Sequence, residues 1–279
     1  MAVAMPASSY TFSLGNAQRI ATNQKSPLNM LNKERIVIVG ATSAIAEQCA
    51  RWWVKESPVD LVLVGRNLAK TEMMAADLRA RSPESSVRSI QADFADPVGI
   101  EELVGRIAQD GAIDIVLIAH GSLPDQQRCQ IDLALSKNEL MINGVSPVLF
   151  AEAFVGWMQK ANAGTLAIIG SVAGDRGRKS NYIYGSAKGM VTRYAQGLQH
   201  RIANTAVKVI LIKPGPTDTP MTAHLKQQGA RLASAEDVAK QIVAGVKRGA
   251  AVVYAPARWA LIMMVIRHLP RFVFNKMDI

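Results

Sequence analysis

Three side chains with complementary chemistry lie close together within residues 164–198. Ser171 follows a short apolar run, and Tyr184 and Lys188 stand four residues apart in a segment typical of a helix. Residues four apart share one face of an α-helix, so the ammonium group of Lys188 can lie beside the phenol of Tyr184. A neighbouring cation favours the phenolate, and we expect it to lower the pKa of the phenol from about 10 toward neutrality. Tyr184 could then act as an acid or base while the hydroxyl of Ser171 holds a carbonyl or carbinol oxygen.

These three residues alone do not establish a catalytic site, because all three residue types are common and such a trio can arise by chance. The elements around it predict an α/β protein, since short apolar runs alternate with segments of helical character. We expect one Rossmann-type domain over residues 34–255, with a doubly wound parallel sheet of about seven strands. The predicted strands are 36–39, 59–64, 86–91, 113–119, 165–169, 207–212 and 251–255.

The first predicted strand ends in a turn of small residues that leads into a helix. Gly40 begins this turn, and Thr42, Ser43 and Ile45 follow it. A strand, a tight turn and a helix in this order aim free backbone N–H groups at a phosphate. The turn needs small residues because a large side chain would keep a pyrophosphate away from the backbone. We therefore expect a dinucleotide to bind here.

The end of the second predicted strand indicates which dinucleotide is preferred. Dinucleotide folds hold the adenosine ribose at this point, where an acid accepts a hydrogen bond from the 2′-hydroxyl. Gly65 leaves no acid there, and Arg66 offers a cation for a 2′-phosphate. We expect NADP(H) to be preferred and NAD(H) to be possible, unless Arg66 is simply a solvated side chain. Asp93, after the third strand, could accept a hydrogen bond from the adenine amino group.

The later strand ends complete the predicted site. Gly121 would let the backbone pass close to the cofactor, whereas His120 is expected to pack or to hydrogen-bond locally. Thr219 could bind the nicotinamide carboxamide, and ligands of open α/β sheets bind at this edge. Asn143, in a predicted helix over 136–160, is either exposed or orders a water linked to Lys188. The predicted cofactor-binding residues are Gly40, Thr42, Ser43, Ile45, Arg66, Asp93, Phe94, Ala119, Gly121, Tyr184, Lys188, Pro214, Thr217 and Thr219.

Over about residues 35–255, these features resemble the classical short-chain dehydrogenase/reductase family. The Ser-x12-Tyr-x3-Lys pattern of the family falls on Ser171, Tyr184 and Lys188, and its catalytic Asn falls on Asn143. The glycine-rich turn is matched in spacing, the NNAG motif is degenerate at residues 118–121, and the PG motif is present after the sixth strand. The resemblance implies an oxidoreductase with these four catalytic residues, assembled as a homodimer or homotetramer.

The departures from the family pattern, together with residues 253–271, resemble one subfamily. It is the decaprenylphosphoryl-2-keto-erythro-pentose reductases, and the similarity extends to residues 222–226. This resemblance implies reduction of a ketone on a sugar that is linked through phosphate to a polyprenol, a cell-envelope glycolipid precursor. Two alternatives stay open: reduction of another lipid ketone, acyl or polycyclic, and a non-catalytic dinucleotide-sensing module. A sensor would have no need of Tyr184 as a proton donor.

The charge of the chain calls for an anionic partner. The formal net charge is +10 and the pI is about 9.8, which suits nucleic acid, anionic lipid or a phosphorylated ligand. No stacking platform or recognition helix accompanies the charge, so we expect no nucleic-acid binding. The two cysteines fit no metal site and favour a reducing, cytoplasmic location.

The last segment, residues 256–279, is both apolar and basic. Residues 238–277 contain no acid, and an uninterrupted apolar run covers 259–266. A helix over 258–269 would be roughly 18 Å long, and no apolar run approaches the roughly 20 residues that a spanning helix needs. This segment could lie on an anionic membrane surface, peripheral on its inner face, or pack on the domain or an oligomer partner.

Two further stretches have open interpretations. Arg176, Arg178 and Lys179 lie between Ser171 and Tyr184 and could hold a lipid phosphate, or they could form a solvated loop. Residues 1–33 contain no acid and no hydrophobic core of a secretory signal. We expect a disordered extension or a start site placed too far upstream, with a transit peptide as the alternative.

Overall fold

The computed structural model describes residues 33–277, and the prediction for residues 1–32 lies outside them. A seven-stranded sheet runs through this part of the chain in the order β3-β2-β1-β4-β5-β6-β9, with every neighbouring pair parallel. The predicted α/β fold with seven parallel strands is therefore confirmed. The strands are β1 (Glu34–Val39), β2 (Val59–Gly65), β3 (Ser86–Gln91), β4 (Ile115–Ile118), β5 (Thr165–Ile169), β6 (Lys208–Pro214) and β9 (Val252–Ala255).

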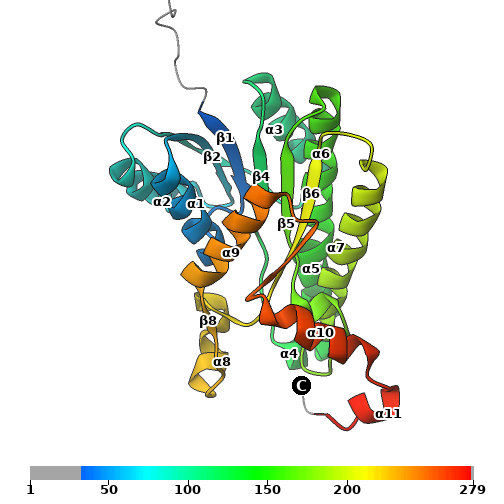
Figure 1. Cartoon of the computed structure of the whole chain (residues 1–279). Coiled ribbons are helices and arrows are strands. Elements are labelled where there is room, and N and C mark those ends of the chain that lie inside the picture. Colours follow the sequence, from blue (N-terminus) through cyan, green and yellow to red (C-terminus); the bar gives the residue numbers. More distant parts are fainter. Residues whose placement is uncertain (1–32, 278–279) are drawn as a thin grey trace, which may run out of the picture. The chain divides into compact units, whose positions relative to one another are not determined.

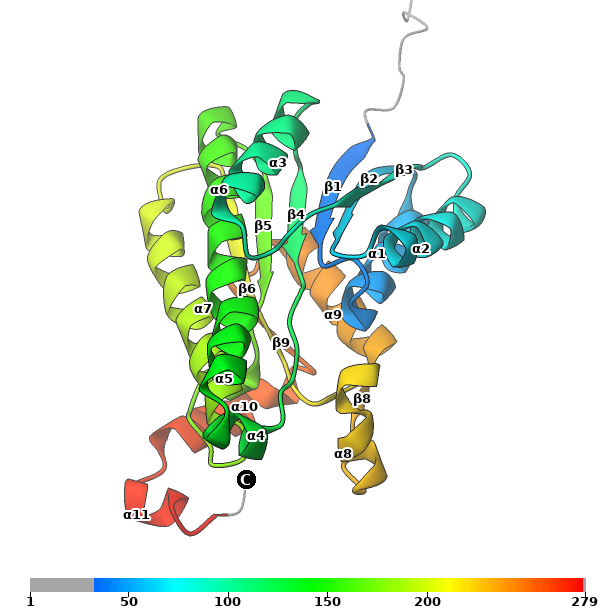
Figure 2. The same cartoon turned by 180° about the vertical axis from the view of Figure 1, so that it is seen from behind.

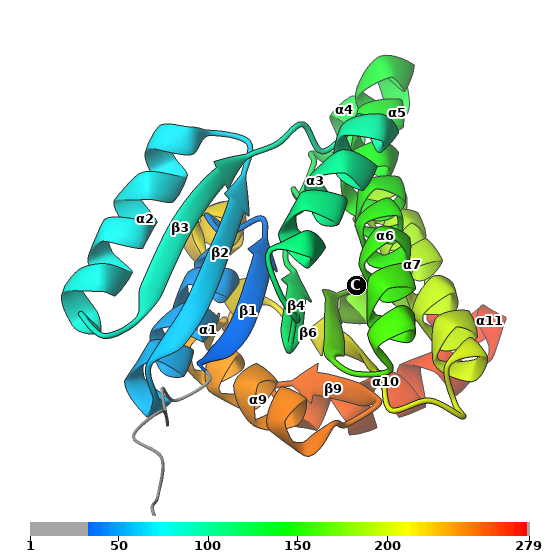
Figure 3. The ribbon, with the colours of Figure 1, turned by 90° about the horizontal axis from the view of Figure 1, so that it is seen from above.

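Helices cover both faces of the sheet, as Figure 3 shows from above. Successive strand residues point to opposite faces, so Ile36 and Ile38 join one hydrophobic core while Val37 and Val39 join the other. Burial on both faces explains why the strands read as continuous β-branched runs. One face carries α1 (Ala44–Glu56), α2 (Leu68–Arg81) and α9 (Ala235–Arg248); the other carries α3 (Pro97–Gln109), α6 (Ser146–Ala161) and α7 (Tyr182–Arg201).

The single helix predicted over 136–160 is built from three parts. The π-helical turn η1 (Met141–Val145) joins α5 (Leu133–Leu140) to α6. Together they form one helix, Leu133–Ala161, that by length and composition alone could cross a membrane. This corrects the expectation that no run approaches that length. In the described chain the helix packs against α3, α7 and the sheet, and such burial is typical of a core helix.

The short elements gather beyond the carboxyl ends of the strands (Figures 1 and 2). Two short helices, η3 (Pro220–Thr222) and α8 (Ala223–Gln227), follow β7 (Thr217–Asp218), which pairs with β8 (Ala233–Ser234). The sheet thus has its long helices on the two faces and its short segments at one edge. These segments are α4 (Gln126–Ile131), η2 (Val172–Gly174), β7 (Thr217–Asp218), η3 (Pro220–Thr222), α8 (Ala223–Gln227), β8 (Ala233–Ser234), α10 (Arg258–His268) and α11 (Arg271–Phe274).

The C-terminal helix α10 packs on the domain through one side only. Met263 is fully buried, and Trp259 lies so close to Gly215 that a Cβ there would sit 2.0 Å from its Nε1. On the other side Leu261 is 64% exposed, and Phe272 of α11 is 72% exposed. Packing on the domain therefore accounts for one face of this segment and leaves an apolar face in solvent.

Candidate active site

A cleft of about 660 Å³ opens at the carboxyl edge of the sheet. Asp93 lies beside it, in a smaller cavity of about 460 Å³ that Arg66 also lines. The remaining predicted site residues (Ala119, Asn143, Lys188 and Pro214) are buried and do not line the cleft. Those that do line it are Gly40, Thr42, Ser43, Ile45, Arg66, Phe94, Gly121, Ser171, Tyr184, Thr217 and Thr219.

The turn between β1 and α1 has the shape and the donors that a pyrophosphate needs. Gly40 has a φ of +82°, and a Cβ on it would lie 2.5 Å from the backbone N of His120. A glycine is therefore required here on two grounds, conformation and space. Thr42, Ser43 and Ile45 then lead into α1, whose first-turn N–H groups have no partner within the helix. These residues fit a dinucleotide phosphate.

The end of β2 has no room for an acid. A Cβ on Gly65 would lie 2.1 Å from Thr71 Oγ1, so α2 packs directly on the strand end. Arg66 follows, and Lys70 lines the same cleft one turn into α2. Asn67 fixes this helix start by accepting a hydrogen bond from the N–H of Lys70 at 2.9 Å. Sequence reasoning missed Lys70, although its position three residues after a helix N-cap was the available signal.

Close packing of η2 on α7 brings Ser171 and Tyr184 together. A Cβ on Gly185 would lie 3.0 Å from the carbonyl oxygen of Ala173, so the two elements meet backbone to backbone. Ser171 Oγ accepts a hydrogen bond from the N–H of Ala173 at 3.1 Å and also hydrogen-bonds to Tyr184. Lys188 Nζ lies 5.8 Å from the centre of the Tyr184 ring. The predicted trio therefore forms one cluster.

The electrostatics of the cluster correct the expected pKa of Tyr184. Burial raises the pKa of Tyr184, and its hydrogen bond with Ser171 lowers the pKa only in part. Lys188 does not reverse this, because its Nζ donates to the carbonyl oxygen of Ile169 at 3.1 Å instead of to the phenol. Burial also lowers the pKa of Lys188 to about 8. At neutral pH Tyr184 is thus a protonated phenol, beside a lysine that is still mainly cationic.

Asn143 is fully buried in the π-helical turn, so the exposed-helix interpretation is wrong. Its Oδ1 accepts from the N–H of Ser122 at 2.9 Å, and its Nδ2 donates to Glu139 Oε2 at 2.9 Å. A Cβ on Gly121 would lie 2.8 Å from Asn143 Oδ1, which explains the glycine. The side chain braces the loop after β4. Glu139 was missed, although its position four residues before Asn143 was the available signal.

His120 is neutral and packs locally, as expected. Its Nε2 hydrogen-bonds to Ser146 Oγ at 2.8 Å, and its ring lies 4.6 Å from that of Phe94, centre to centre. Burial lowers the pKa of His120 to about 3. An aromatic wall therefore separates the cleft from the core under α6.

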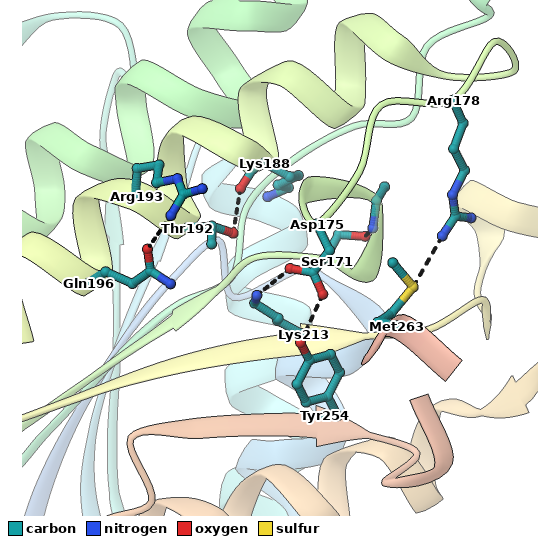
Figure 4. Close-up of polar contacts among 11 residues, drawn as sticks. Ser171, Asp175, Arg178, Lys188, Thr192, Arg193, Gln196, Lys213, Tyr254 and Met263 are labelled. Atoms are coloured by element: carbon teal, nitrogen blue, oxygen red, sulfur yellow. Dashed lines mark hydrogen bonds and ion pairs between the residues drawn. The ribbon is translucent and has the colours of Figure 1, made fainter. Parts of the chain in front are cut away.

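A second polar cluster lies behind the serine loop, and sequence reasoning missed it (Figure 4). Asp175, four residues after Ser171, forms an ion pair with Lys213 at the end of β6, and both side chains are almost fully buried. Tyr254 of β9 donates to the second carboxylate oxygen of Asp175 at 2.8 Å. This cluster joins the serine loop to two strand ends.

Two of the basic residues between Ser171 and Tyr184, Arg176 and Arg178, have different surroundings. Arg176 donates to the carbonyl oxygens of Ile266 and Leu269 at the end of α10, and it stacks on Phe274. Arg178 lines the cleft and contacts Met263 of α10. The interpretation that these two arginines belong to a solvated loop is therefore wrong.

The comparisons with known proteins identify the family. The family model "short chain dehydrogenase" matches residues 34–230. This chain belongs to the short-chain dehydrogenase family. It is 30% identical over 246 residues to an uncharacterized oxidoreductase of Streptomyces coelicolor, covering 87% of this chain and 95% of that protein. It is 31% identical over 245 residues to an uncharacterized oxidoreductase of Mycobacterium tuberculosis, covering 87% and 96% of the two chains.

Solved structures of dehydrogenases share the fold. One is the short-chain dehydrogenase of Sphingobium yanoikuyae in complex with NADPH, with a TM-score of 0.74 and 22% identity over 88% of this chain and 96% of that one. Another is the bulky-bulky ketone specific alcohol dehydrogenase of Comamonas testosteroni, with a TM-score of 0.72, 22% identity and the same coverage. Together with the family model and the curated relatives, this makes the chain an oxidoreductase of the short-chain dehydrogenase type.

Proposed function

We propose that this short-chain dehydrogenase reduces a ketone on a lipophilic substrate of the polyprenyl-phosphate-linked sugar type, with NADP(H) preferred over NAD(H). The observation that carries the chemistry is the cluster of Ser171 and Tyr184 on the cleft wall, with Lys188 directly behind them. A protonated tyrosine at this place suits the reductive direction, because the product alcohol needs a proton on its oxygen.

The cofactor is held by residues of the first half of the domain. The N–H groups at the start of α1 take the pyrophosphate, and Arg66 with Lys70 takes the 2′-phosphate of NADP(H). Asp93 lies beside Arg66 and suits the adenine, while Gly121 and Thr219 line the nicotinamide end of the cleft. When bound, the dinucleotide supplies the hydride that reduces the carbonyl carbon.

Side chains of the protein donate the proton that the reduction requires. Tyr184 donates its hydroxyl proton to the carbonyl oxygen, and Ser171 holds the same oxygen by a hydrogen bond. The ammonium of Lys188 stabilises the phenolate that remains, which is the state that burial alone disfavours. Asn143 is proposed to order a water through its backbone for the return of the proton, because its side-chain amide is already bound.

The cofactor preference and the substrate class are tested together. We expect the purified protein to oxidise NADPH with a polyprenyl-phosphate keto-sugar and to use NADH less well. Arg66→Ala should erase the preference, whereas Arg248→Ala, an exposed control on α9, should keep it. Turnover confined to acyl or polycyclic ketones would replace the proposed substrate, and NADPH binding without turnover of any ketone would indicate a sensing module.

A lipophilic substrate agrees with the exposed apolar face of the tail. Leu261, Met264 and Val265 on α10 are exposed, and Arg258 and Arg267 flank them. Apolar side chains with cations at their border suit an anionic membrane surface. We propose that this face binds the inner surface of the membrane, peripherally.

Vesicle flotation tests this contact. The full chain should float with vesicles that contain phosphatidylglycerol, and Leu261→Gln with Val265→Gln should reduce the floating fraction. Val98 on α3, 64% exposed like Leu261, supplies the matched control Val98→Gln. Equal flotation of the tail variant and this control contradicts the membrane contact.

We further propose a homodimer or homotetramer that is assembled through the helices 136–160 and 184–203, as the family resemblance implies. Light scattering coupled to size-exclusion chromatography gives the mass, and a monomer at micromolar concentration contradicts this assembly.

A further inference from the structure

Arg178 lies on the wall of the cleft, in the loop that joins the catalytic serine to the catalytic tyrosine. Asn181 lies on the same wall, and its buried Oδ1 has no hydrogen-bond partner among the described residues. The opposite end of the cleft is formed by the β1–α1 turn and Arg66. β2, which precedes Arg66, and β5, which precedes Ser171, are three positions apart in the sheet, a separation of about 14 Å. The β1–α1 turn follows β1, which is two positions from β5, about 10 Å. The loop that carries Arg178 therefore follows a different strand from those that precede the residues assigned to the cofactor phosphates.

The guanidinium group of Arg178 is half-buried and has few polar partners among the described residues. Within residues 33–277 no carboxylate forms an ion pair with it. Its recorded hydrogen bond runs from Nη2 to the thioether sulfur of Met263 over 3.4 Å (Figure 4), and a thioether is a weak acceptor. Its Nε is buried without a partner in this part of the chain. Among the described residues, the five N–H donors of this group thus make one weak hydrogen bond.

Two other cations of the domain, both more buried than Arg178, are compensated by carboxylates, whereas Lys188 donates to the carbonyl oxygen of Ile169. Arg35 pairs with Asp60 and Asp110, and Lys213 pairs with Asp175. A desolvated cation costs free energy unless an anion or several acceptors repay the cost. Asp175, the acid nearest in sequence to Arg178, is already bound to Lys213 and Tyr254. Asp175 therefore acts on Arg178 as a charge beyond ion-pair distance. An anionic ligand would supply the close counter-charge that the described residues do not provide.

The neighbouring Arg176 differs from Arg178, because its hydrogen-bond donors are already used within the described chain. Arg176 donates to two carbonyl oxygens at the end of α10 and stacks 3.8 Å from the Phe274 ring centre. It holds the tail in place, and the tail in turn supplies Met263 beneath Arg178. An apolar, adaptable methionine under a guanidinium leaves the fork of N–H donors to an incoming ligand.

We propose that Arg178 binds the phosphate group of the substrate and thereby selects phosphorylated over unphosphorylated lipids. A planar guanidinium matches a phosphate with two parallel N–H···O bonds, which a lysine cannot reproduce. This inference rests on the proposed reductase function, because only that function makes the bound phosphate part of a substrate. The binding itself is measurable without turnover.

Calorimetric titration of the protein saturated with NADP⁺ tests the proposal, because the bound cofactor blocks its own phosphate sites. The probes are geranyl phosphate, geraniol and inorganic phosphate. We expect geranyl phosphate to bind at least about tenfold tighter than geraniol, a difference of about 1.4 kcal/mol. Arg178→Met should remove this preference while geraniol binding stays the same, and Arg178→Lys should give an intermediate value. The exposed control Arg248→Met should behave as the unchanged protein.

Each outcome has one meaning. If inorganic phosphate binds as tightly as geranyl phosphate and Arg178→Met abolishes both, the anion site stands and its ligand is a free phosphate. If Arg178→Met keeps the melting temperature and the tenfold preference, or if Arg178→Lys binds as the unchanged protein does, the proposal is overturned. Loss of the preference in a protein that reduces no ketone would reject the proposed function and retain the anion site.

Discussion

Two tyrosine–lysine pairs lie within the same domain, and they differ in one group. Lys188 Nζ is 5.8 Å from the centre of the Tyr184 ring, and Lys213 Nζ is 5.4 Å from that of Tyr254. Both lysines are buried, at 2% and 3% exposure. The second pair has a carboxylate, Asp175, bound to both of its members. The first pair has a serine and a backbone carbonyl in its place.

The carboxylate decides what each pair can do. Asp175 neutralises Lys213 and holds the hydroxyl of Tyr254, which together with burial raises the pKa of Tyr254 to about 12. That pair is fixed and joins the serine loop to the sheet. In the first pair, burial lowers the pKa of Lys188 to about 8. The Tyr184 hydroxyl meets Ser171 instead of a carboxylate, so it can give its proton to a ligand. The same two residue types are thus structural in one place and reactive in the other.

The largest expected difference between the pairs is in rate. Tyr184→Phe removes the proton donor and should lower kcat by about 10²- to 10⁴-fold, the usual contribution of a general acid. Tyr254→Phe removes a hydroxyl that faces Asp175, and kcat should stay within a few-fold. Steady-state NADPH oxidation measures both, with NADPH binding by fluorescence as the check that the cleft is intact. Near-normal turnover of Tyr184→Phe refutes the mechanism.

The next difference is in stability. Asp175→Asn leaves the ammonium of Lys213 buried without its carboxylate, and we expect the free energy of unfolding to fall by about 3–5 kcal/mol. Adding Lys213→Met to that variant removes the stranded charge and should recover much of the loss. Lys188→Met strands no partner charge, so it should cost clearly less. Urea denaturation measures all three, and an equal cost for Asp175→Asn and Lys188→Met would contradict the distinction.

The smallest expected effect concerns His120. Like Lys188, it is a buried base that has no carboxylate partner among the described residues. Its pKa falls from 6.5 to about 3 in the folded chain, so between these values the unfolded chain binds more protons. The free energy of unfolding should therefore drop as pH falls from about 6.5 toward 3, by about 1.4 kcal/mol per pH unit from this group. Above pH 6.5 the group contributes no slope.

Comparison with His120→Asn isolates this contribution, because asparagine does not titrate in the range. Urea denaturation at pH 7, 6 and 5 should give a shallower decline for the variant than for the unchanged protein. Parallel declines would mean that His120 is protonated in the folded chain.

The elements of the sheet could be predicted because their signal is local. Residues 86–91 and 165–169 were predicted as strands and coincide with β3 and β5. β4 is shorter than the predicted 113–119, because the carboxylate of Asp114 accepts from the N–H of Arg35 and lies before the ladder. Apolar runs identify buried strands, but the hydrogen bonds at their ends depend on neighbours elsewhere in the chain.

Much of the site was also predictable, for the same reason. Tyr184 and Lys188 sit four residues apart on one helix, so their proximity needs no tertiary information. The π-helical turn at Asn143 was not predictable, because this turn packs against α7, a segment far away in the sequence. The expected fall in the pKa of Tyr184 was wrong, because burial raises this pKa and outweighs the lowering effect of the hydrogen bond with Ser171. Burial is a property of the folded domain.

The sequence by itself determined that this chain has a serine, a tyrosine and a lysine at the spacing of the short-chain dehydrogenases, on a parallel α/β sheet. Only the tertiary structure decided which buried cations are compensated. Asp175, Lys213 and Tyr254 meet across 79 residues of chain, whereas Lys188 and Arg178 meet no carboxylate within residues 33–277. Spacing along a helix places two side chains on one face, but the solvation and counter-charge that set their protonation come from segments far away in the sequence.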